Sequence, residues 1–512
     1  MEIEPYDQDE SESEEDRIDE KDYEGASLDD IYNDMKHAQH VEWPNNAYRE
    51  FMKITTRYQL SNSASDAMIH FFNKFSNLDN SPLPVSIRIG KKFLDSANIR
   101  YNTFKEIFIT TFQNIEYTLY YRPVIQAIKS LLVIDDVNQN FAVCYEEKWE
   151  MRNGIKHRIF EEQYNCNWWK REESKLLAEH RLLSIILYSD ATTLDHMGKS
   201  SGHPLFLSLG NIPNCQRNKP ESKALVAYLP IIKAKDSKTK NSENFRRLQR
   251  NVFQRCLTIL LKPILEEPEL HFLVCHEVIT FVPQISVILA DMAEADKLTN
   301  VYQPSSSKKP CASCLVSKDD LNNMGLIEIS PRTPYNMRKA IENDEAHDNS
   351  IHPEPNVFWK LRYKIIINLY NSLLKYLRFI RAFNIYQAIV PDRMHALDLG
   401  LFKYMLDYTK ELLNNQCGGS AVQTLKQRLV SIPRFHGLKV MKNVSDMTWM
   451  TADELQNIMK VIILVLNNLY ESNGEEEVSN EQLCKVFHKF LRMYLATRED
   501  SFTSDSCAEL QV

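Results

Sequence analysis

Short apolar runs bounded by turn residues occupy the middle of the chain. Three of them cover residues 183–188, 204–210 and 224–231. Runs of this length with such flanks are typical of buried β-strands. A fourth run, "ITFVPQISVILA", ends directly before Asp291. The pattern therefore predicts four strands of one sheet.

Helical periodicity surrounds these strands. Apolar residues recur at every third or fourth position in "SENFRRLQRNVFQRCLTILLKPILEE", which predicts a long helix between the third and fourth strands. Another helix is expected after Asp291. Residues 31–180 and 325–440 are predicted to be helical, the latter including "NVFWKLRYKIIINLYNSLLKYLRFIRAF" and "RMHALDLGLFKYMLDYTKELL". A last helix, "TADELQNIMKVIILVLNNLY", is expected to start at Thr451 to Asp453.

The order strand, strand, strand, helix, strand, helix is the one that a ribonuclease-H-like α/β fold needs. In that fold the first strand is central and the fourth lies parallel beside it. We therefore expect a mixed-sheet core interrupted by a large helical insertion. The predicted units are an acidic disordered tail (1–30), a helical N-terminal region (31–180), the first part of the core (181–324), the insertion (325–440) and a truncated completion of the core (441–512).

Glycine content and charge refine this picture. Only 12 of 512 residues are glycine, which argues against an all-β fold because tight hairpins depend on glycine for positive φ. The first 30 residues carry a net charge of −13 and the remaining residues a net charge of +5, which together give −8. An acidic leader of this kind is expected to be disordered. The mildly basic remainder is compatible with a polyanionic partner.

The cysteines and the apolar runs indicate a cellular setting. Ten cysteines are scattered, the amino terminus is polar and acidic, and no apolar run approaches the ~20 residues that cross a bilayer. We expect a soluble intracellular protein with reduced thiols. Cys311 and Cys314 have the spacing of half a zinc site, but no second pair follows at finger spacing, so two reduced thiols in a loop are an equal alternative.

Two aspartates stand at the ends of predicted strands. Asp190 closes the first strand and Asp291 closes the fourth. Because parallel neighbours end at the same edge of a sheet, both carboxylates are expected to meet there and to bind divalent cations. A third acid from a later helix would complete a two-metal site for phosphoryl chemistry. The simpler alternative is that each aspartate caps a strand or starts a turn.

Eight segments resemble, in the same order, blocks of Plavaka transposases, which belong to the Kyakuja, Dileera and Zisupton group related to CACTA-type transposons. The likeness extends from about Trp43 to Asp505. The segments are "ILYSDATTLD", "HPLFLSLGNIP", "ALVAYLPIIKA", "ILADMAEADKLTN", "CASCLVSKDDL", "IVPDRMHALDLGLFKYML", "IPRFHGLKVMKNVSDMTWMTADELQNIMKV" and "MYLATREDSFT".

The resemblance implies a nuclear DDE-type transposase that cuts and joins DNA strands with Mg²⁺ or Mn²⁺. Its DNA partners would be transposon ends and target, and it would act without a membrane and as a candidate homo-oligomer. Carried over by position, the three catalytic acids are Asp190, Asp291 and Glu454. Asp392 and His395 match an Asp-x-x-His element that lies near the active site in related superfamilies.

Each carried-over residue also has a simpler explanation. Glu454 is equally a first-turn glutamate favoured by the helix dipole, with Asp453 as its nearest rival. Asp392 and His395 are equally an N-cap followed by a helix-facing histidine. Trp449 is expected in the core. Eight basic residues are candidates for phosphate contacts: Arg362, Lys364, Lys375, Arg378, Arg381, Arg434, Lys439 and Lys442. A solvated helix face explains the first five of them equally well.

Two departures from the family keep other functions open. The chain begins without the zinc-finger-like segment that members carry, and it is expected to stop in mid-domain. A catalytically inactive or truncated transposase-derived protein that binds DNA or acts as a scaffold is therefore the main alternative. A ribonuclease-H-like nuclease unconnected to transposition is the third.

Overall fold

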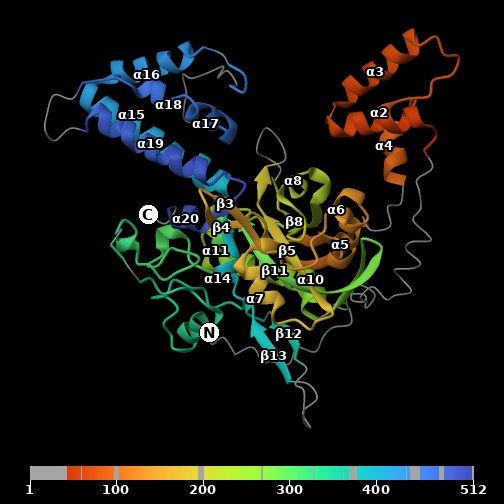
Figure 1. Cartoon of the computed structure of the whole chain (residues 1–512), viewed down its shortest axis with the longest axis horizontal. Coiled ribbons are helices and arrows are strands. Elements are labelled where there is room, and N and C mark those ends of the chain that lie inside the picture. The colour runs from red at the N-terminus through yellow and green to blue at the C-terminus, as the bar shows by residue number, and fades with distance from the viewer. Residues whose placement is uncertain are drawn as a thin grey trace.

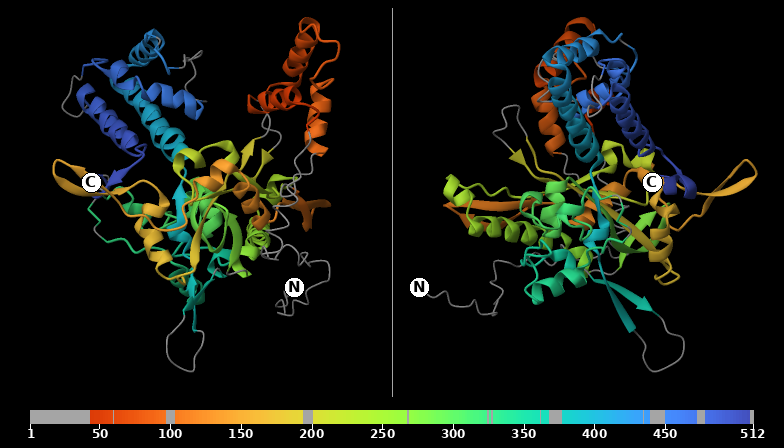
Figure 2. Two further views of the ribbon diagram at one scale, coloured as in Figure 1. Left: turned by 45° about the vertical axis from the view of Figure 1, so that its right-hand side comes forward. Right: turned by 90° about the vertical axis from the view of Figure 1, so that its left-hand side faces the viewer.

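The computed structural model describes most of residues 43–509. The residues left out within that span are 59, 97–102, 194–200, 267–268, 324, 327, 361, 368–376, 434, 439–449 and 472–477. The chain forms a mixed α/β protein built around a curled sheet, with two groups of helices standing apart from it (Figures 1 and 2). The expectation of an α/β fold is confirmed.

The central sheet has eight strands in the described residues. Seven follow the order β1-β2-β9-β8-β5-β11-β10, and β14 pairs with the other end of β11. β5 lies antiparallel to β8 and parallel to β11, and β14 is parallel to β11. The predicted parallel pairing of the first and fourth strands is thus confirmed. The strands are β1 (Lys105–Phe112), β2 (Ile115–Tyr121), β5 (His180–Ser189), β8 (Pro204–Leu209), β9 (Ala224–Tyr228), β10 (Leu270–Val274), β11 (Glu277–Ala290) and β14 (Ile389–Pro391).

Helices cover the sheet and bury its apolar residues. The predicted long helix is α10 (Glu243–Glu266), which packs against β1 and against α5 (Val124–Leu132). α7 (Asn167–Glu173) packs against β5 and buries Trp169 completely. α11 (Met292–Thr299) follows β11 directly. Leu183, Ile185 and Leu187 of β5 lie in the resulting core, which explains the unbroken apolar run in the sequence.

Helices after the sheet form a second core. α15 (Lys403–Cys417), α16 (Gly419–Ser431), α17 (Ala452–Met459), α18 (Ile462–Leu466) and α19 (Asn480–Ala496) enclose a separate apolar cluster. The π-helix η7 (Met394–Phe402) connects this helical unit to β14. The predicted last helix starts at its expected N-cap, Thr451, but divides into α17 and α18.

Two further groups complete the described residues. α2 (Asn46–Arg57), α3 (Asn62–Phe75) and α4 (Ile87–Ser96) share a small core of their own and stand to one side in Figure 1. β3 (Lys148–Arg152) and β4 (Ile155–Phe160) form a hairpin that pairs with β15 (Phe502–Thr503), which leads into α20 (Ser504–Glu509).

Two helical predictions are wrong. Residues 105–160 contain four strands, of which β1 and β2 extend the main sheet. Within 356–383 the structure has a short helix α13 (Val357–Lys360) and a hairpin of β12 (Arg362–Ile367) with β13 (Leu377–Ala382). Three consecutive isoleucines in β12 favour a strand over the helix that the apolar spacing predicted.

Candidate metal centre

Three parallel strands end side by side, and each is followed by an aspartate. Asp190 follows β5, Asp291 follows β11 and Asp392 follows β14. The backbone N–H of Asp392 donates to the carbonyl oxygen of Ala290 (2.8 Å), which extends the pairing of β14 with β11 to this edge. The sheet therefore gathers three carboxylates that are about 100 residues apart along the chain.

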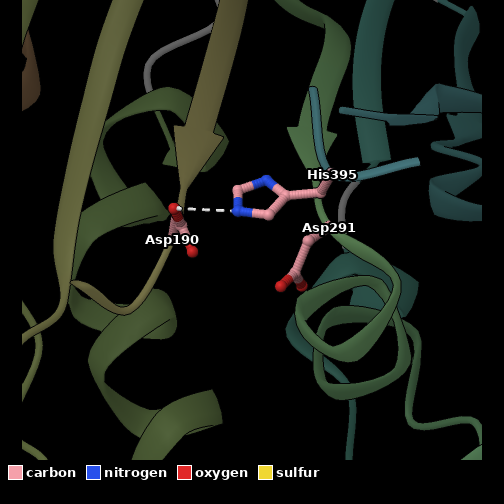
Figure 3. A group of neighbouring side chains, drawn as sticks. All are labelled: Asp190, Asp291 and His395. Carbon is pink, nitrogen blue, oxygen red and sulfur yellow. Dashed lines mark ion pairs between the residues drawn. The ribbon is translucent and has the colours of Figure 1, made fainter. Parts of the chain in front are cut away.

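Asp190, Asp291 and His395 form a group in which one ligand atom from each lies within 4.8 Å of the others. Figure 3 shows the imidazole of His395 pointing toward Asp190, with the side chain of Asp291 beside it. The distance from His395 Nε2 to Asp190 Oδ2 is 4.0 Å. All three side chains are half-buried. Carboxylate oxygens and imidazole nitrogen are ligands that Mn²⁺ and other divalent cations accept.

Asp392 fixes the orientation of the imidazole. His395 lies one turn after Asp392, and its Nδ1–H donates to Asp392 Oδ2 (2.6 Å). This bond leaves Nε2 facing Asp190. Histidines that bind metals are commonly held in this way by a carboxylate on the other nitrogen. Asp392 thus acts through His395.

The surroundings of Asp190 disfavour an uncompensated charge. Burial raises the pKa of Asp190, the charge of His395 opposes that rise, and the neighbouring Asp291 adds to it. The hydroxyl of Tyr188 donates to Asp190 Oδ2 (3.3 Å), and burial together with the charge of Asp190 raises the pKa of this phenol. A bound cation would favour the ionised carboxylate. The centre is therefore suited to a divalent ion.

Glu454 is not part of this group. It occupies the third position of α17, in the helical unit, and its Oε2 accepts from the backbone N–H (2.8 Å) and the hydroxyl (2.9 Å) of Thr451. The hydroxyl of Thr451 in turn accepts from the N–H of Glu454. This reciprocal capping box agrees with the simpler explanation of Glu454 as a first-turn glutamate. Its rival Asp453 is exposed on the same turn.

Cys311 and Cys314 lie together in a loop. The Cys311 thiol accepts from the N–H of Ser313 (3.3 Å), and burial raises the pKa of Cys314. Among the residues that the structure describes, no group of three or more metal-binding side chains includes either cysteine. The zinc site stays a prediction. The guanidinium of Arg332 donates to the carbonyl oxygens of both cysteines and so holds the loop in place.

The basic residues that were predicted to contact phosphates lie partly on a hairpin and partly outside the described residues. The backbone places Arg362, Lys364, Arg378 and Arg381 on the β12–β13 hairpin, so a shared helix face is wrong for these four. Lys375, Arg434, Lys439, Lys442 and Trp449 lie outside the described residues.

The sequence analysis missed a buried polar cluster beside the two aspartates. Glu294, His203 and Ser189 lie within hydrogen-bonding distance of one another. Glu294 follows Asp291 by three residues, a spacing that signals a capped helix start. His203 stands immediately before β8, the strand that pairs with β5. No sequence pattern indicated that these residues would meet.

Asp296 on α11 carries a buried carboxyl whose charge should oppose folding. It is 5 % exposed, and its Oδ2 has no hydrogen-bond partner among the described residues. Burial raises its pKa to about 7, against the opposing charge of Arg332. Stability from the protonated form is fully present below the unfolded pKa of about 4 and is lost as the pH rises through 7.

We expect Asp296→Asn to stabilise the protein more at pH 8 than at pH 5.5. The difference in gain between the two pH values should be about 2 kcal/mol, because the wild type bears the cost of ionising this buried carboxyl mainly at the higher pH. Urea unfolding of both proteins at both pH values measures it. An equal change at pH 5.5 and pH 8 would contradict the assignment.

Comparison with known proteins assigns the chain to a family. No curated protein gives a match. No helix in the described ranges is both long and apolar enough to cross a bilayer. Residues 92–409 match the family model described as Plavaka transposase. That span includes Asp190, Asp291, Asp392 and His395 and excludes Glu454. Since the match covers more than half of the 512 residues, the chain belongs to the Plavaka transposase family.

Proposed function

We propose that this protein is a DDE-type transposase that cleaves and joins DNA strands with divalent cations held by Asp190, Asp291 and His395. Membership of the family implies an enzyme of the polynucleotidyl transferase kind that binds DNA. The observation that carries the finer proposal is the convergence of ligand atoms from these three residues to within 4.8 Å. Action on chromosomal DNA would place the protein in the nucleus.

The strand arrangement supports a ribonuclease-H-like core. The path β9-β8-β5-β11-β14 has three antiparallel strands followed by two parallel ones, with β5 in the centre. The order of elements in the sequence predicted the central first strand and its parallel fourth neighbour, but not β14. The arrangement brings the first and fourth strands to one edge, where a cleavage site in such a core is expected. β10 and the β1–β2 hairpin are additions at its two sides.

The residues of the metal centre would have different roles in the reaction. When bound, divalent cations lower the pKa of an attacking water or 3′ hydroxyl and stabilise the leaving oxygen of an in-line displacement at phosphorus. Asp190 and Asp291 would hold them from two adjacent strands. His395 would supply a neutral nitrogen, and Asp392 keeps its ring in the orientation that this requires.

His395 is the third ligand that the geometry favours over Glu454. Both are proposals, and they differ in what the chain must do. His395 already faces Asp190, whereas Glu454 would first have to give up the bonds from its carboxylate to Thr451. Losing a capping box costs about 1 kcal/mol, so Glu454 could join the centre only with a rearrangement of α17.

A basic segment at the same edge of the sheet is the proposed path of the DNA backbone. β9 rises toward this edge, where the N–H of Leu229 donates to the carbonyl of His203. Residues 233–247 follow and carry a net charge of +4. The N–H groups of Lys233 and Lys235 donate to Tyr117 and Gln113 beside the β1–β2 turn. β2 lies three strands away from β5 in the sheet, a separation of about 14 Å. This separation is shorter than one turn of a DNA duplex.

Reversing charge in this segment should weaken DNA binding in a salt-dependent way. Lys233, Lys238 and Lys240 are exposed and free of ion pairs with described residues. In the triple glutamate variant we expect the slope of log affinity against log salt to fall by about 2 to 3, about one unit for each lost phosphate contact. Fluorescence anisotropy with a labelled duplex between 50 and 200 mM salt measures it.

A matched variant separates position from charge. Lys485, Lys489 and Arg492 are exposed on α19, in the helical unit. Their replacement by glutamate changes the net charge equally and should leave the slope nearly as in the wild type. Equal effects of the two triple variants would remove the basic segment from the DNA path.

The proposed function is tested by incubating the full chain with Mn²⁺ and a labelled duplex that carries the terminal repeats flanking its gene. Strand nicking at the repeat boundary supports it. DNA binding without nicking, in Mg²⁺ as well as Mn²⁺, would instead favour the transposase-derived binding or scaffold protein.

A further inference from the structure

A buried acid on α11 contacts the last residue of β5 and the residue that precedes β8. Glu294 is 2 % exposed, and its Oε1 accepts from the hydroxyl of Ser189 (2.7 Å) and from Nε2–H of His203 (2.7 Å). Ser189 and His203 are also buried, and their side chains are 3.1 Å apart. Burying three polar side chains together costs free energy unless every one of them is hydrogen-bonded.

The charge of Glu294 is retained despite this burial. Burial alone would raise its pKa, but the hydrogen bond and charge of His203, the ammonium of Lys297 and the hydroxyl of Ser189 outweigh it and lower the pKa to about 2. Lys297 Nζ lies 3.1 Å from Glu294 Oε2. The ring of His203 also stacks on Phe253 of α10, which holds it in one orientation.

The cluster has the residue types of a hydrolase triad but not its geometry. In such a triad the serine and the acid contact opposite nitrogens of the imidazole, so that a proton can pass through the ring. Here Ser189 Oγ and Glu294 Oε1 both meet Nε2. Ser189 is also 0 % exposed and cannot reach a substrate. The cluster therefore positions other groups.

Its connections lead to two of the three proposed ligands, Asp190 and Asp291. Ser189 immediately precedes Asp190 on β5. The backbone N–H of Glu294 donates to Asp291 Oδ1 (2.6 Å), which fixes the Asp291 side chain at the start of α11. The carboxylate of Glu294 thus binds the residue next to one ligand, while its backbone binds the other ligand directly.

We propose that Glu294, with Ser189 and His203, is a positioning residue that sets the separation of Asp190 and Asp291 before cations bind. This inference rests on the proposed function, because it assigns the two aspartates to a metal centre. Removing the Glu294 carboxylate frees the end of β5 to move relative to α11. The affinity for the cation then falls, while the reacting groups themselves stay intact.

The test measures Mn²⁺ affinity of the full chain by the electron paramagnetic resonance of free Mn²⁺. Glu294→Gln keeps the size of the side chain and removes its charge, and Glu294→Ala removes the group. Both should bind Mn²⁺ about 10- to 100-fold more weakly, as is usual when a group that orients a metal ligand is lost. At saturating Mn²⁺ the nicking rate should return to within a few-fold of the wild type.

Thr299→Val provides the matched control on the same helix. Its hydroxyl is fully buried and donates to the carbonyl of Ala295 (2.6 Å), away from both aspartates. This variant should lose stability in urea and keep wild-type Mn²⁺ affinity. Ser189→Ala, which shortens the network by one hydroxyl, should weaken Mn²⁺ binding even if Glu294→Ala fails to fold.

Wild-type Mn²⁺ affinity in both Glu294→Gln and Ser189→Ala would overturn the positioning role and leave the metal centre standing. If Asp190→Ala also binds Mn²⁺ like the wild type, the metal centre itself is wrong and the proposed function falls with it.

Discussion

Replacing Asp190 or Asp291 by alanine is expected to lower Mn²⁺-dependent nicking by about a thousandfold or more. Each variant removes one carboxylate from a group whose ligand atoms lie within 4.8 Å of one another. A cation in such a centre provides several kcal/mol of transition-state stabilisation, and every 1.36 kcal/mol corresponds to a factor of ten in rate. The measurement is the initial nicking rate on the labelled terminal-repeat duplex.

Two further variants make this result specific. Asp190→Asn keeps the shape of the side chain and should be nearly as inactive, since the neutral amide is a poorer ligand for a hard cation. Asp135→Ala removes an exposed aspartate at the start of α6 (Asp135–Gln139) and should nick like the wild type. Undiminished nicking in both Asp190→Ala and Asp291→Ala would show that these residues are not the metal ligands.

The second large effect is expected at Arg332, a fully buried guanidinium that hydrogen-bonds to no carboxylate among the described residues. It donates instead to the carbonyl oxygens of three neighbouring loop residues and of one residue farther along the chain: Lys309 (2.7 Å), Cys311 (2.9 Å), Cys314 (3.1 Å) and Asn349 (2.8 Å). Burial lowers its pKa. One side chain therefore satisfies three carbonyl groups of the cysteine loop and joins that loop to Asn349.

Arg332→Ala should lower the free energy of unfolding by about 3 to 5 kcal/mol, because several buried carbonyl groups lose their donor and a cavity opens. Arg332→Lys keeps the charge but has no planar fork of donors, so it should recover only part of the loss. Urea unfolding at pH 7 measures both.

Arg338→Ala is the matched control. Arg338 lies on α12 (Pro334–Glu342) and is less buried, and among the described residues its side chain donates to the carbonyl of Pro334 alone. Its loss should cost under about 1 kcal/mol. A loss at Arg332 no larger than at Arg338 would mean that water replaces the guanidinium without cost.

The sheet was predictable where burial on both faces removed ambiguity. β5, β8, β9 and β11 appear in the sequence as apolar runs that end at turn residues, and the parallel pairing of β5 with β11 followed from their order. β1 to β4 were missed because polar and charged residues interrupt their apolar positions, so that the apolar residues show no clear strand periodicity.

The metal centre was predictable only in part, for two different reasons. Strand order alone indicated that Asp190 and Asp291 would be neighbours. The third position could not be found that way, because Thr451 to Glu454 fits a capping box as well as a ligand, and local sequence does not distinguish the two. His395 reaches Asp190 through the addition of β14 to the sheet, a three-residue strand too short to recognise by pattern.

The attachment of the helical unit has a mechanical consequence. The chain enters this unit from β14 through η7 and comes back to the body at β15, which pairs with β4 (Figure 1). Because the helical unit is attached to the rest of the protein at two separate points, it can tilt about the line that joins them but cannot rotate freely. Because the first fastening carries His395, any such tilt would be transmitted to the edge where the three strands end.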